Sequence, residues 1–204
     1  MKRLAPLAAI LFLLASCALA PAHSPESDAR WQARRGALQG VEHFVLHGRF
    51  SAGGLGAVGG HLFWEERPDG FELRVSGPFG SHPATVTGHG ETVEVRSEQE
   101  SFTTTDPEAA LRQRLGWDFP VRHLRWWILG VPAPGPAADV SLDEDGLVTA
   151  MQQDGWTLDY EDYLPYDSLS LPHRVSAQKD DARIRLVIDQ WSDVGGAAGN
   201  LPAR

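Results

Sequence analysis

The chain has 204 residues, of which 42% are apolar and 22% charged, with 21 Gly and 14 Pro. These proportions are typical of a globular protein and exclude a disordered, collagen-like or polytopic membrane chain. The 18 Lys and Arg against 27 Asp and Glu give a formal net charge of −9. Because no basic stripe stands out, we expect no nucleic-acid partner. The single Cys excludes an internal disulfide framework and a Cys-rich metal site.

The first residues have the pattern of a targeting segment. Lys2 and Arg3 precede an apolar run over 4–14, which is too short to span a bilayer of about 30 Å but suits a secretory signal. The run ends in Leu14-Ala15-Ser16-Cys17, which resembles the bacterial lipobox. We therefore expect a lipoprotein signal peptide over 1–16, lipid attachment at Cys17 and a flexible tether over 17–30. The alternative is an ordinary signal peptide cleaved a few residues later, which would leave an incidental Cys.

A lipidated Cys17 predicts attachment to a membrane through acyl chains, since two or three such chains anchor a protein stably. In bacteria that use this motif, Asp after the Cys is associated with retention at the inner membrane. Ala18 stands there in this chain, which favours the outer membrane, with the folded domain on the periplasmic side.

From Val41 onward, alternating apolar and polar residues between turn signals predict a series of short strands. The expected strands cover 41–50, 57–66, 70–76, 84–88, 91–97, 99–104, 137–143, 147–153, 156–163, 171–178 and 183–191. Asp-Gly pairs at 69–70, 145–146 and 154–155 indicate hairpin turns, because type I′ turns require positive φ. The alternation predicts an antiparallel sheet with one apolar face.

Two helices are expected between the strands. The first begins after Asp106 and Pro107 and ends at Gly116, and the second runs from Pro120 to Gly130. The sequence also favours a further short helix over 31–38. We therefore predict a mainly β (α+β) fold: one strongly curled antiparallel sheet whose open apolar side is covered by the helices. The expected domain spans 31–191, followed by a loose tail over 192–204.

Motifs for cofactors, metals and catalysis are weak. The glycines at 54–59 match a dinucleotide-binding pattern, but the chain continues into a strand instead of a helix, so a hairpin explains them better. The histidines are scattered, and no G-x-S-x-G nucleophile motif is present. We predict no metal, no cofactor and no enzymatic activity. A hydrolase assembled in space from scattered Ser, His and Asp stays open as an alternative.

Two stretches carry a resemblance to a known family. The run Pro120 to Pro132 reads PVRHLRWWILGVP, and the run Leu73 to Ser81 reads LRVSGPFGS. Together with the lipobox and the strand series, they resemble the LolB family of outer-membrane lipoprotein receptors over about 31–191. That family has a similar Leu-Arg-x-Trp-Ile-Leu-Gly-x-Pro helix and a strand ending in an Asn/Gly-Pro-apolar-Gly loop. The Gly-rich 53–60 hairpin and the tail depart from the family pattern.

The resemblance implies a half-barrel of about eleven strands with a helical lid over an apolar cavity. It implies a monomeric receptor that accepts acylated lipoproteins from the periplasmic carrier LolA and inserts them into the lipid of the outer membrane. The implied cavity and lid residues are Leu124, Trp127, Ile128, Trp156, Leu158, Tyr160, Ile184, Leu186 and Ile188, and the implied membrane-insertion loop is Gly77, Pro78, Phe79 and Gly80.

The residues alone leave two alternatives open. The apolar side chains could fill a solid core in a structural or assembly lipoprotein that has no ligand cavity. The ring of Phe79 could fold back onto the sheet instead of protruding.

Overall fold

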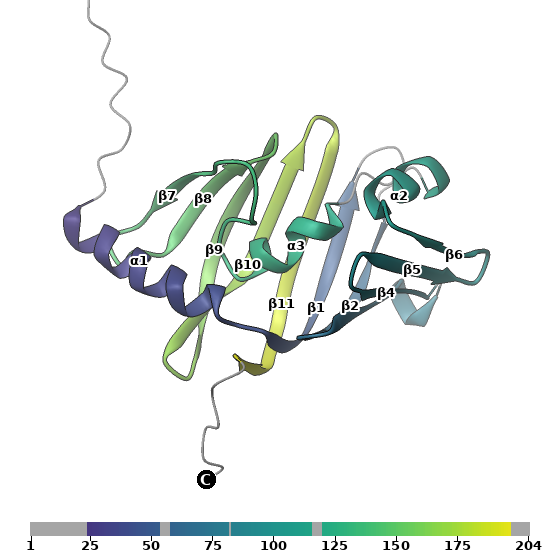
Figure 1. The fold of residues 1–204 in the computed structure, drawn as a ribbon, viewed down its shortest axis with the longest axis horizontal. Helices are drawn as coiled ribbons and strands as arrows, with labels where there is room; N and C mark the ends of the chain where they lie inside the picture. Colours follow the sequence, from purple (N-terminus) through teal and green to yellow (C-terminus); the bar gives the residue numbers. More distant parts are fainter. Residues whose placement is uncertain (1–23, 54–57, 82, 116–119, 197–204) are drawn as a thin grey trace, which may run out of the picture.

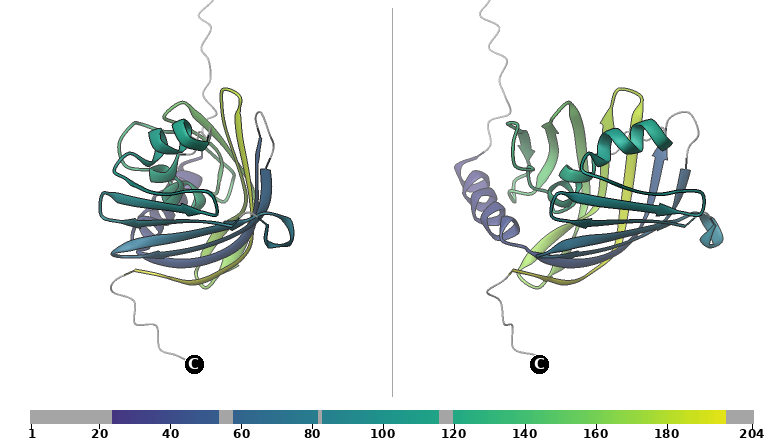
Figure 2. Two further views of the ribbon diagram at one scale, coloured as in Figure 1. Left: turned by 90° about the vertical axis from the view of Figure 1, so that its right-hand side faces the viewer. Right: turned by 45° about the vertical axis from the view of Figure 1, so that its right-hand side comes forward.

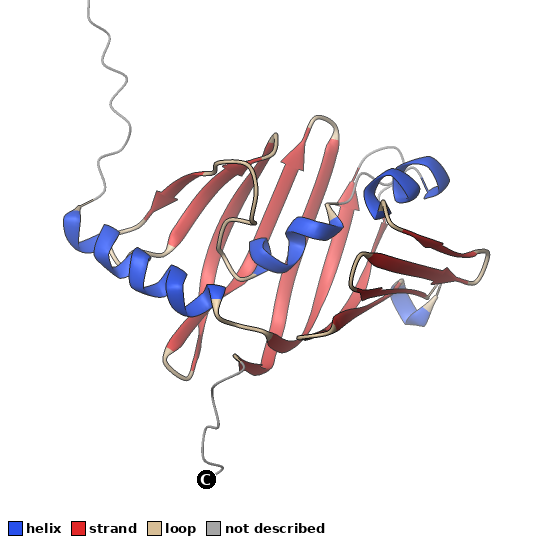
Figure 3. Ribbon diagram, viewed as in Figure 1, coloured by secondary structure: helices blue, strands red, loops and turns tan. Residues whose placement is uncertain are grey.

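The computed structural model describes residues 24–53, 58–81, 83–115 and 120–196 (Figure 1). The expected signal peptide, Cys17, the centre of the Gly-rich hairpin and the helix cap expected at Gly116 lie outside the described residues. The described chain forms one strongly curled sheet, with the helices on its concave side and along one end (Figures 1 and 3).

Eleven strands form this sheet, in the order β6-β5-β4-β3-β2-β1-β11-β10-β9-β8-β7. The strands are β1 (His43–Gly53), β2 (Val58–Arg67), β3 (Gly70–Ser76), β4 (Ala84–His89), β5 (Thr92–Ser97), β6 (Ser101–Thr104), β7 (Asp139–Leu142), β8 (Val148–Gln153), β9 (Trp156–Tyr166), β10 (Leu169–Lys179) and β11 (Ala182–Gly195). The helices are α1 (Pro25–Gln39), the 3₁₀ turn η1 (Pro78–Gly80), α2 (Pro107–Leu115) and α3 (Val121–Ile128).

The predicted strands are confirmed, and they pair as two antiparallel meanders. One meander runs from β1 to β6 and the other from β7 to β11, and the pairing of β1 with β11 joins them. The sheet stays open, with β6 and β7 at its edges. The chain must pass from one edge to the other between these two strands, so the segment that holds α2 and α3 crosses the concave side (Figure 2).

The N-terminal helix begins earlier than expected. The Ser24 side chain accepts a hydrogen bond from the backbone N–H of Ser27, and Pro25 occupies the first helical turn, so α1 starts at Pro25. The prediction of a flexible tether is therefore wrong for 25–30, while the helix expected over 31–38 is present as part of α1. The predicted loose tail is likewise wrong for 192–195, which continue β11.

Helix α3 ends where the sequence predicts, in a Schellman motif. The N–H of Gly130 donates to the carbonyl of Trp127, and the N–H of Val131 donates to the carbonyl of Trp126. This motif requires positive φ at the residue after the C-cap, which is Gly130 here, and Gly130 has φ 76°. The sharp end of α3 turns the chain back toward the sheet at 131–138.

The core lies between the concave face of the sheet and the helices. Aromatic side chains form its centre: the ring of Phe44 lies 5.8 Å from that of Trp64 and 5.6 Å from that of Trp191. Each buried apolar side chain of this size contributes about 1.5–3 kcal/mol to folding. Alternate residues on the same strands face outward, so the convex side of the sheet is polar, as the period-2 pattern predicts.

Candidate functional site

The structure brings the implied cavity and lid residues together on the concave side. They belong to one apolar cluster, in which β9, β11 and α3 each contribute neighbouring side chains. Trp127, Leu158 and Ile188 have no exposed surface, so they contact no water-sized space. These side chains fill the space under α3 in this structure, and an acyl chain can lie there only if α3 or its neighbours move apart.

The C-terminal end of α3 is fastened to β8 and β9 by buried hydrogen bonds. The Gln153 side-chain oxygen accepts from Trp127 Nε1 at 2.8 Å and from the N–H of Ala133 at 2.9 Å. The Gln153 side-chain nitrogen donates to the carbonyls of Ala133 at 2.7 Å and Pro136 at 2.9 Å. The Tyr160 hydroxyl donates to the carbonyl of Trp127 at 2.9 Å. These bonds fix both the end of α3 and the loop that follows it.

The middle of α3 is fastened to β2 by an ion pair. Arg125 Nε lies 3.1 Å from Glu66 Oε1, and Trp64 Nε1 donates to Glu66 Oε2 at 3.0 Å. Glu66 is only 6% exposed on an otherwise apolar face. Burial raises the pKa of the Glu66 carboxyl to about 7, although Arg125 and the Trp64 hydrogen bond act in the opposite direction.

A groove of about 570 Å³ opens beside this fastened helix, between α1 and the loop after α3. Its apolar lining includes Trp31 of α1 and Trp126 of α3, together with the Pro- and Ala-rich segment 132–138. Two polar side chains of α1, Arg35 and Gln39, also line it. Its size is in the range of ligand-binding pockets, and it is lined both by the half-buried Trp126 of α3 and by the buried Trp31 of α1.

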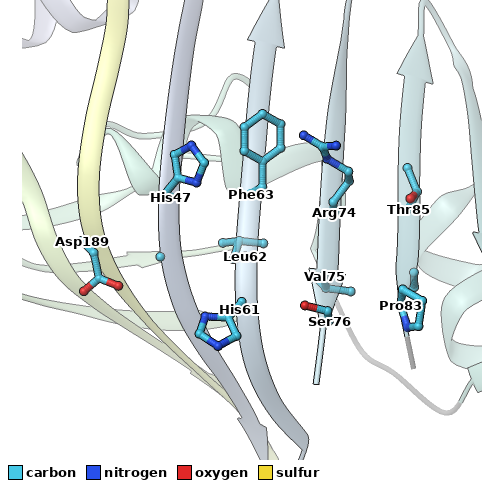
Figure 4. Close-up of a pocket in the computed structure, with 12 residues that line it drawn as sticks. His47, His61, Leu62, Phe63, Arg74, Val75, Ser76, Pro83, Thr85 and Asp189 are labelled. Carbon is cyan, nitrogen blue, oxygen red and sulfur yellow. The ribbon is translucent and has the colours of Figure 1, made fainter. Parts of the chain in front are cut away.

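A second hollow, of about 410 Å³, lies on the convex face (Figure 4). The Arg74 guanidinium lies 4.0 Å from the centre of the Phe63 ring, and the His47 ring lies 4.9 Å from it. Asp189 at the margin forms an ion pair with Arg49 at 2.8 Å. Arg74 also forms an ion pair with Glu72 at 3.2 Å, and the sheet itself separates the hollow from the apolar interior.

The implied insertion loop joins β3 to β4 and contains η1. It projects from the sheet on the side of the molecule away from α1 (Figure 2). The N–H of Gly77 donates to the carbonyl of Ser81 at 2.7 Å, which closes the base of the loop, and Pro78 and Gly80 are exposed. A side chain at Gly60 would collide with the Ser76 carbonyl, so that glycine lets β2 pass close to the loop. The side chain of Phe79 lies outside the described part of the structure.

The sequence prediction missed the groove, and it also missed the hydrogen bonds and the ion pair that hold α3 against the sheet. One face of α1 could have been predicted from the sequence, because its groove residues lie four positions apart: Trp31, Arg35 and Gln39. No pattern in the sequence pairs this face with residues 132–138, nor Glu66 with Arg125, because these contacts join segments far apart in the chain. Within the described residues, no helix is long and apolar enough to span a membrane.

Comparison with known proteins gives consistent results. The model of the family described as "Outer membrane lipoprotein LolB" matches residues 42–191. The outer-membrane lipoprotein LolB of Stutzerimonas stutzeri is 34% identical over 194 residues, covering 92% of this chain and 93% of the relative. The LolB of Nitrosococcus oceani is 37% identical over 186 residues, covering 89% of this chain and 92% of the relative.

Solved structures share the fold at low sequence identity. A LolA superfamily protein from Nitrosomonas europaea superposes with a TM-score of 0.52 at 10% identity, covering 88% of this chain and 96% of that one. A DUF1329 family protein from Desulfovibrio piger gives a TM-score of 0.52 at 9% identity, covering 86% of this chain and 95% of that one. The sequence matches and the open eleven-stranded sheet together show that the chain belongs to the LolB family of outer-membrane lipoproteins, which are receptors in lipoprotein trafficking and not enzymes.

Proposed function

We propose that this protein accepts acylated lipoproteins from the periplasmic carrier LolA, holds their acyl chains under α3, and inserts them into the outer membrane without covalent chemistry. The energetics of acyl chains support this role. A chain of about 15 methylenes in water costs on the order of 12 kcal/mol relative to an apolar environment, so its transfer requires a dry apolar site. The family and its place at the outer membrane are consistent with this cargo.

The observation that carries the proposal is the construction of the concave side. An open sheet presents a continuous apolar face, α3 crosses it, and the groove beside α1 opens next to the covered space. We propose that Leu124, Trp127 and Ile128 of α3 move away from the apolar residues of β9 and β11 when a chain enters. Only α3 and the loop after it must shift, because the strands below are held by their backbone pairing.

Hand-over between two carriers requires closely matched affinities. A difference of several kcal/mol would leave the cargo on one partner, since each 1.4 kcal/mol changes the equilibrium constant tenfold. The tight packing under α3 contributes to this balance: contacts among Trp127, Leu158 and Ile188 must be exchanged for contacts with the acyl chain. The net gain from binding is therefore smaller than the full transfer energy of the chain.

For delivery, we propose that the loop Gly77-Pro78-Phe79-Gly80 contacts the membrane. It projects from the sheet, and two of its residues, Pro78 and Gly80, are exposed. Insertion of one Phe side chain into lipid contributes roughly 1.5–3 kcal/mol, which suits a reversible contact. The domain limits expected from the sequence fit this proposal if the folded unit also includes α1 from Pro25.

Photocrosslinking tests the proposal against a structural lipoprotein with no ligand site. The full-length, acylated protein in proteoliposomes is mixed with LolA that carries a lipoprotein with diazirine-bearing acyl chains, and irradiated. We expect crosslinks in α3 and the groove residues of α1. A properly folded protein that gives no crosslinks would support the structural alternative, and crosslinks confined to Phe63 and Arg74 would move the site to the convex hollow.

A further inference from the structure

One cation in the groove has no partner in the described structure. The Nε–H of Arg35 is buried and has no hydrogen-bond acceptor among the described residues, and no described carboxylate lies within ion-pair distance of this side chain. The other arginines of α1 are differently placed. Arg30 donates to the carbonyl of Glu144 at 2.8 Å, and the Arg34 guanidinium lies 5.3 Å from the centre of the Tyr163 ring.

The described residues that line the groove around Arg35 include no acidic group. The described lining of the groove consists of Trp, Pro, Ala, Gly and Val residues apart from Arg35 and Gln39, which lie one helical turn apart on α1. A buried N–H without an acceptor is costly, on the order of 1–3 kcal/mol, and a shift of the Arg35 side chain that brings this N–H to a ligand oxygen in the groove recovers that cost. The groove thus combines apolar side chains with hydrogen-bond donors from α1, and its described lining carries no negative charge.

We propose that this groove binds the linkage end of the cargo's acyl groups, with Arg35 donating a hydrogen bond to an ester carbonyl. This inference rests on the proposed function. A triacylated lipoprotein terminus has no free amine, and its ester and amide carbonyls lie directly beside the hydrocarbon chains. The chains extend past Trp31 and Trp126 toward the core, while the carbonyls stay at the α1 margin. Arg35 is a positioning residue that selects acyl linkages over plain alkyl chains.

Two lipopeptides of equal chain length test this selectivity. One, the acyl lipopeptide, carries two diazirine-bearing chains through ester bonds; the other, the alkyl lipopeptide, carries the same chains through ether bonds, and both keep the N-acyl amide, so that neither gains a charged amine. Each is titrated onto the full-length protein in nanodiscs, and the yield of crosslinked protein gives an apparent affinity. We expect the acyl lipopeptide to bind about tenfold more tightly, as for one hydrogen bond from a charged donor. Arg35→Met should remove this difference while leaving binding of the alkyl lipopeptide unchanged.

Three control variants or probes separate the outcomes. Arg30→Met removes a cation of α1 outside the groove and should keep the tenfold ratio, whereas Ala138→Phe narrows the groove and should weaken both lipopeptides. Equal affinities for the two lipopeptides in the unmodified protein would overturn the role of Arg35 and leave the proposed function intact. No labelling by either would overturn the proposed function itself. A phospholipid with a diazirine-bearing chain is the third probe. If it labels the protein more strongly than the acyl lipopeptide does, and if Arg35→Met removes that labelling, the groove binds membrane lipid and the assignment to cargo is contradicted.

Discussion

Arg125 on α3 and Glu66 on β2 form an ion pair inside the apolar interior, with Nε and Oε1 separated by 3.1 Å. The same guanidinium donates to the carbonyl of Val41 at 2.8 Å, so Arg125 connects α3 both to β2 and to the segment that precedes β1. Together with Gln153 at the C-terminal end, this pair holds α3 against the sheet. Movement of α3 in the proposed cycle must therefore break or carry along a buried charge pair.

Removal of one partner should be more damaging than removal of both. Arg125→Met leaves the carboxylate of Glu66 buried without a counter-charge, and we expect a loss of about 3 kcal/mol in the free energy of unfolding near pH 8. The double variant Glu66→Met/Arg125→Met should regain most of that loss, because apolar side chains fit this interior. Urea denaturation measures both values. A double variant less stable than Arg125→Met would contradict this account.

The pKa of Glu66 gives the stability a characteristic pH dependence. The folded carboxyl, with a pKa of about 7 against 4.5 for the ordinary group, binds its proton more tightly than the unfolded one. Its contribution is therefore fully present below pH 4.5 and is lost as the pH rises through about 7. The size of this contribution is about 3 kcal/mol. Glu66→Gln should remove this pH-dependent contribution. The difference in the free energy of unfolding between the variant and the unmodified protein should therefore change by about 3 kcal/mol between pH 5 and 8. A constant difference would contradict the raised pKa.

Gln153 should be essential for the position of the loop after α3. Gln153→Leu removes four hydrogen bonds, to Trp127 Nε1, to the N–H and carbonyl of Ala133 and to the carbonyl of Pro136. We expect a loss of about 4 kcal/mol, on the order of 1 kcal/mol for each group left unpaired. Amide hydrogen exchange at Ala133 should also accelerate. The neighbouring Gln152 is exposed, and Gln152→Leu serves as the matched control, with a change within about 0.5 kcal/mol. Similar losses in both variants would contradict the role of Gln153.

The sequence predicted local features well and distant contacts poorly. Strand alternation, the Asp154-Gly155 turn with φ of 52° and 77°, and the Gly130 cap all depend on neighbours in the chain, and all are present. The start of α1 was missed because 25–30 has no apolar periodicity, although Ser24 before Pro25 is a local capping signal. Glu66 and Arg125 are each ordinary surface residues in the sequence, and only the crossing of α3 over β2 brings them together.

Two glycine substitutions should have opposite effects on stability. Gly36 lies within α1 with no atom within 4 Å of an added Cβ, so Gly36→Ala should stabilise the protein by about 0.5–1 kcal/mol. Gly130 has φ 76°, and its added Cβ would lie 3.3 Å from Pro172 Cγ, so Gly130→Ala should destabilise it by at least about 1 kcal/mol. Thermal unfolding of both variants measures this. A stabilising Gly130→Ala would contradict the Schellman cap.

The loop between β3 and β4 should act in delivery and not in uptake. Phe79→Glu places a charge where the proposed loop meets lipid, so we expect normal folding and cargo uptake but failed insertion into vesicles. Thr103→Glu on the exposed edge strand β6 adds the same charge elsewhere and should deliver normally. Sedimentation of vesicles separates delivered cargo from retained cargo. Loss of uptake or of folding in Phe79→Glu would contradict a role confined to delivery.

Cargo hand-over tests the central claim most directly. LolA preloaded with a triacylated lipoprotein is mixed with the full-length protein in proteoliposomes, and the distribution of cargo among carrier, receptor and lipid is followed over time. We predict that the cargo leaves LolA, appears transiently on this protein in contact with α3 and the groove, and then enters the lipid. Cargo that stays on an active carrier in the presence of folded receptor would contradict the claim that this concave site receives acyl chains.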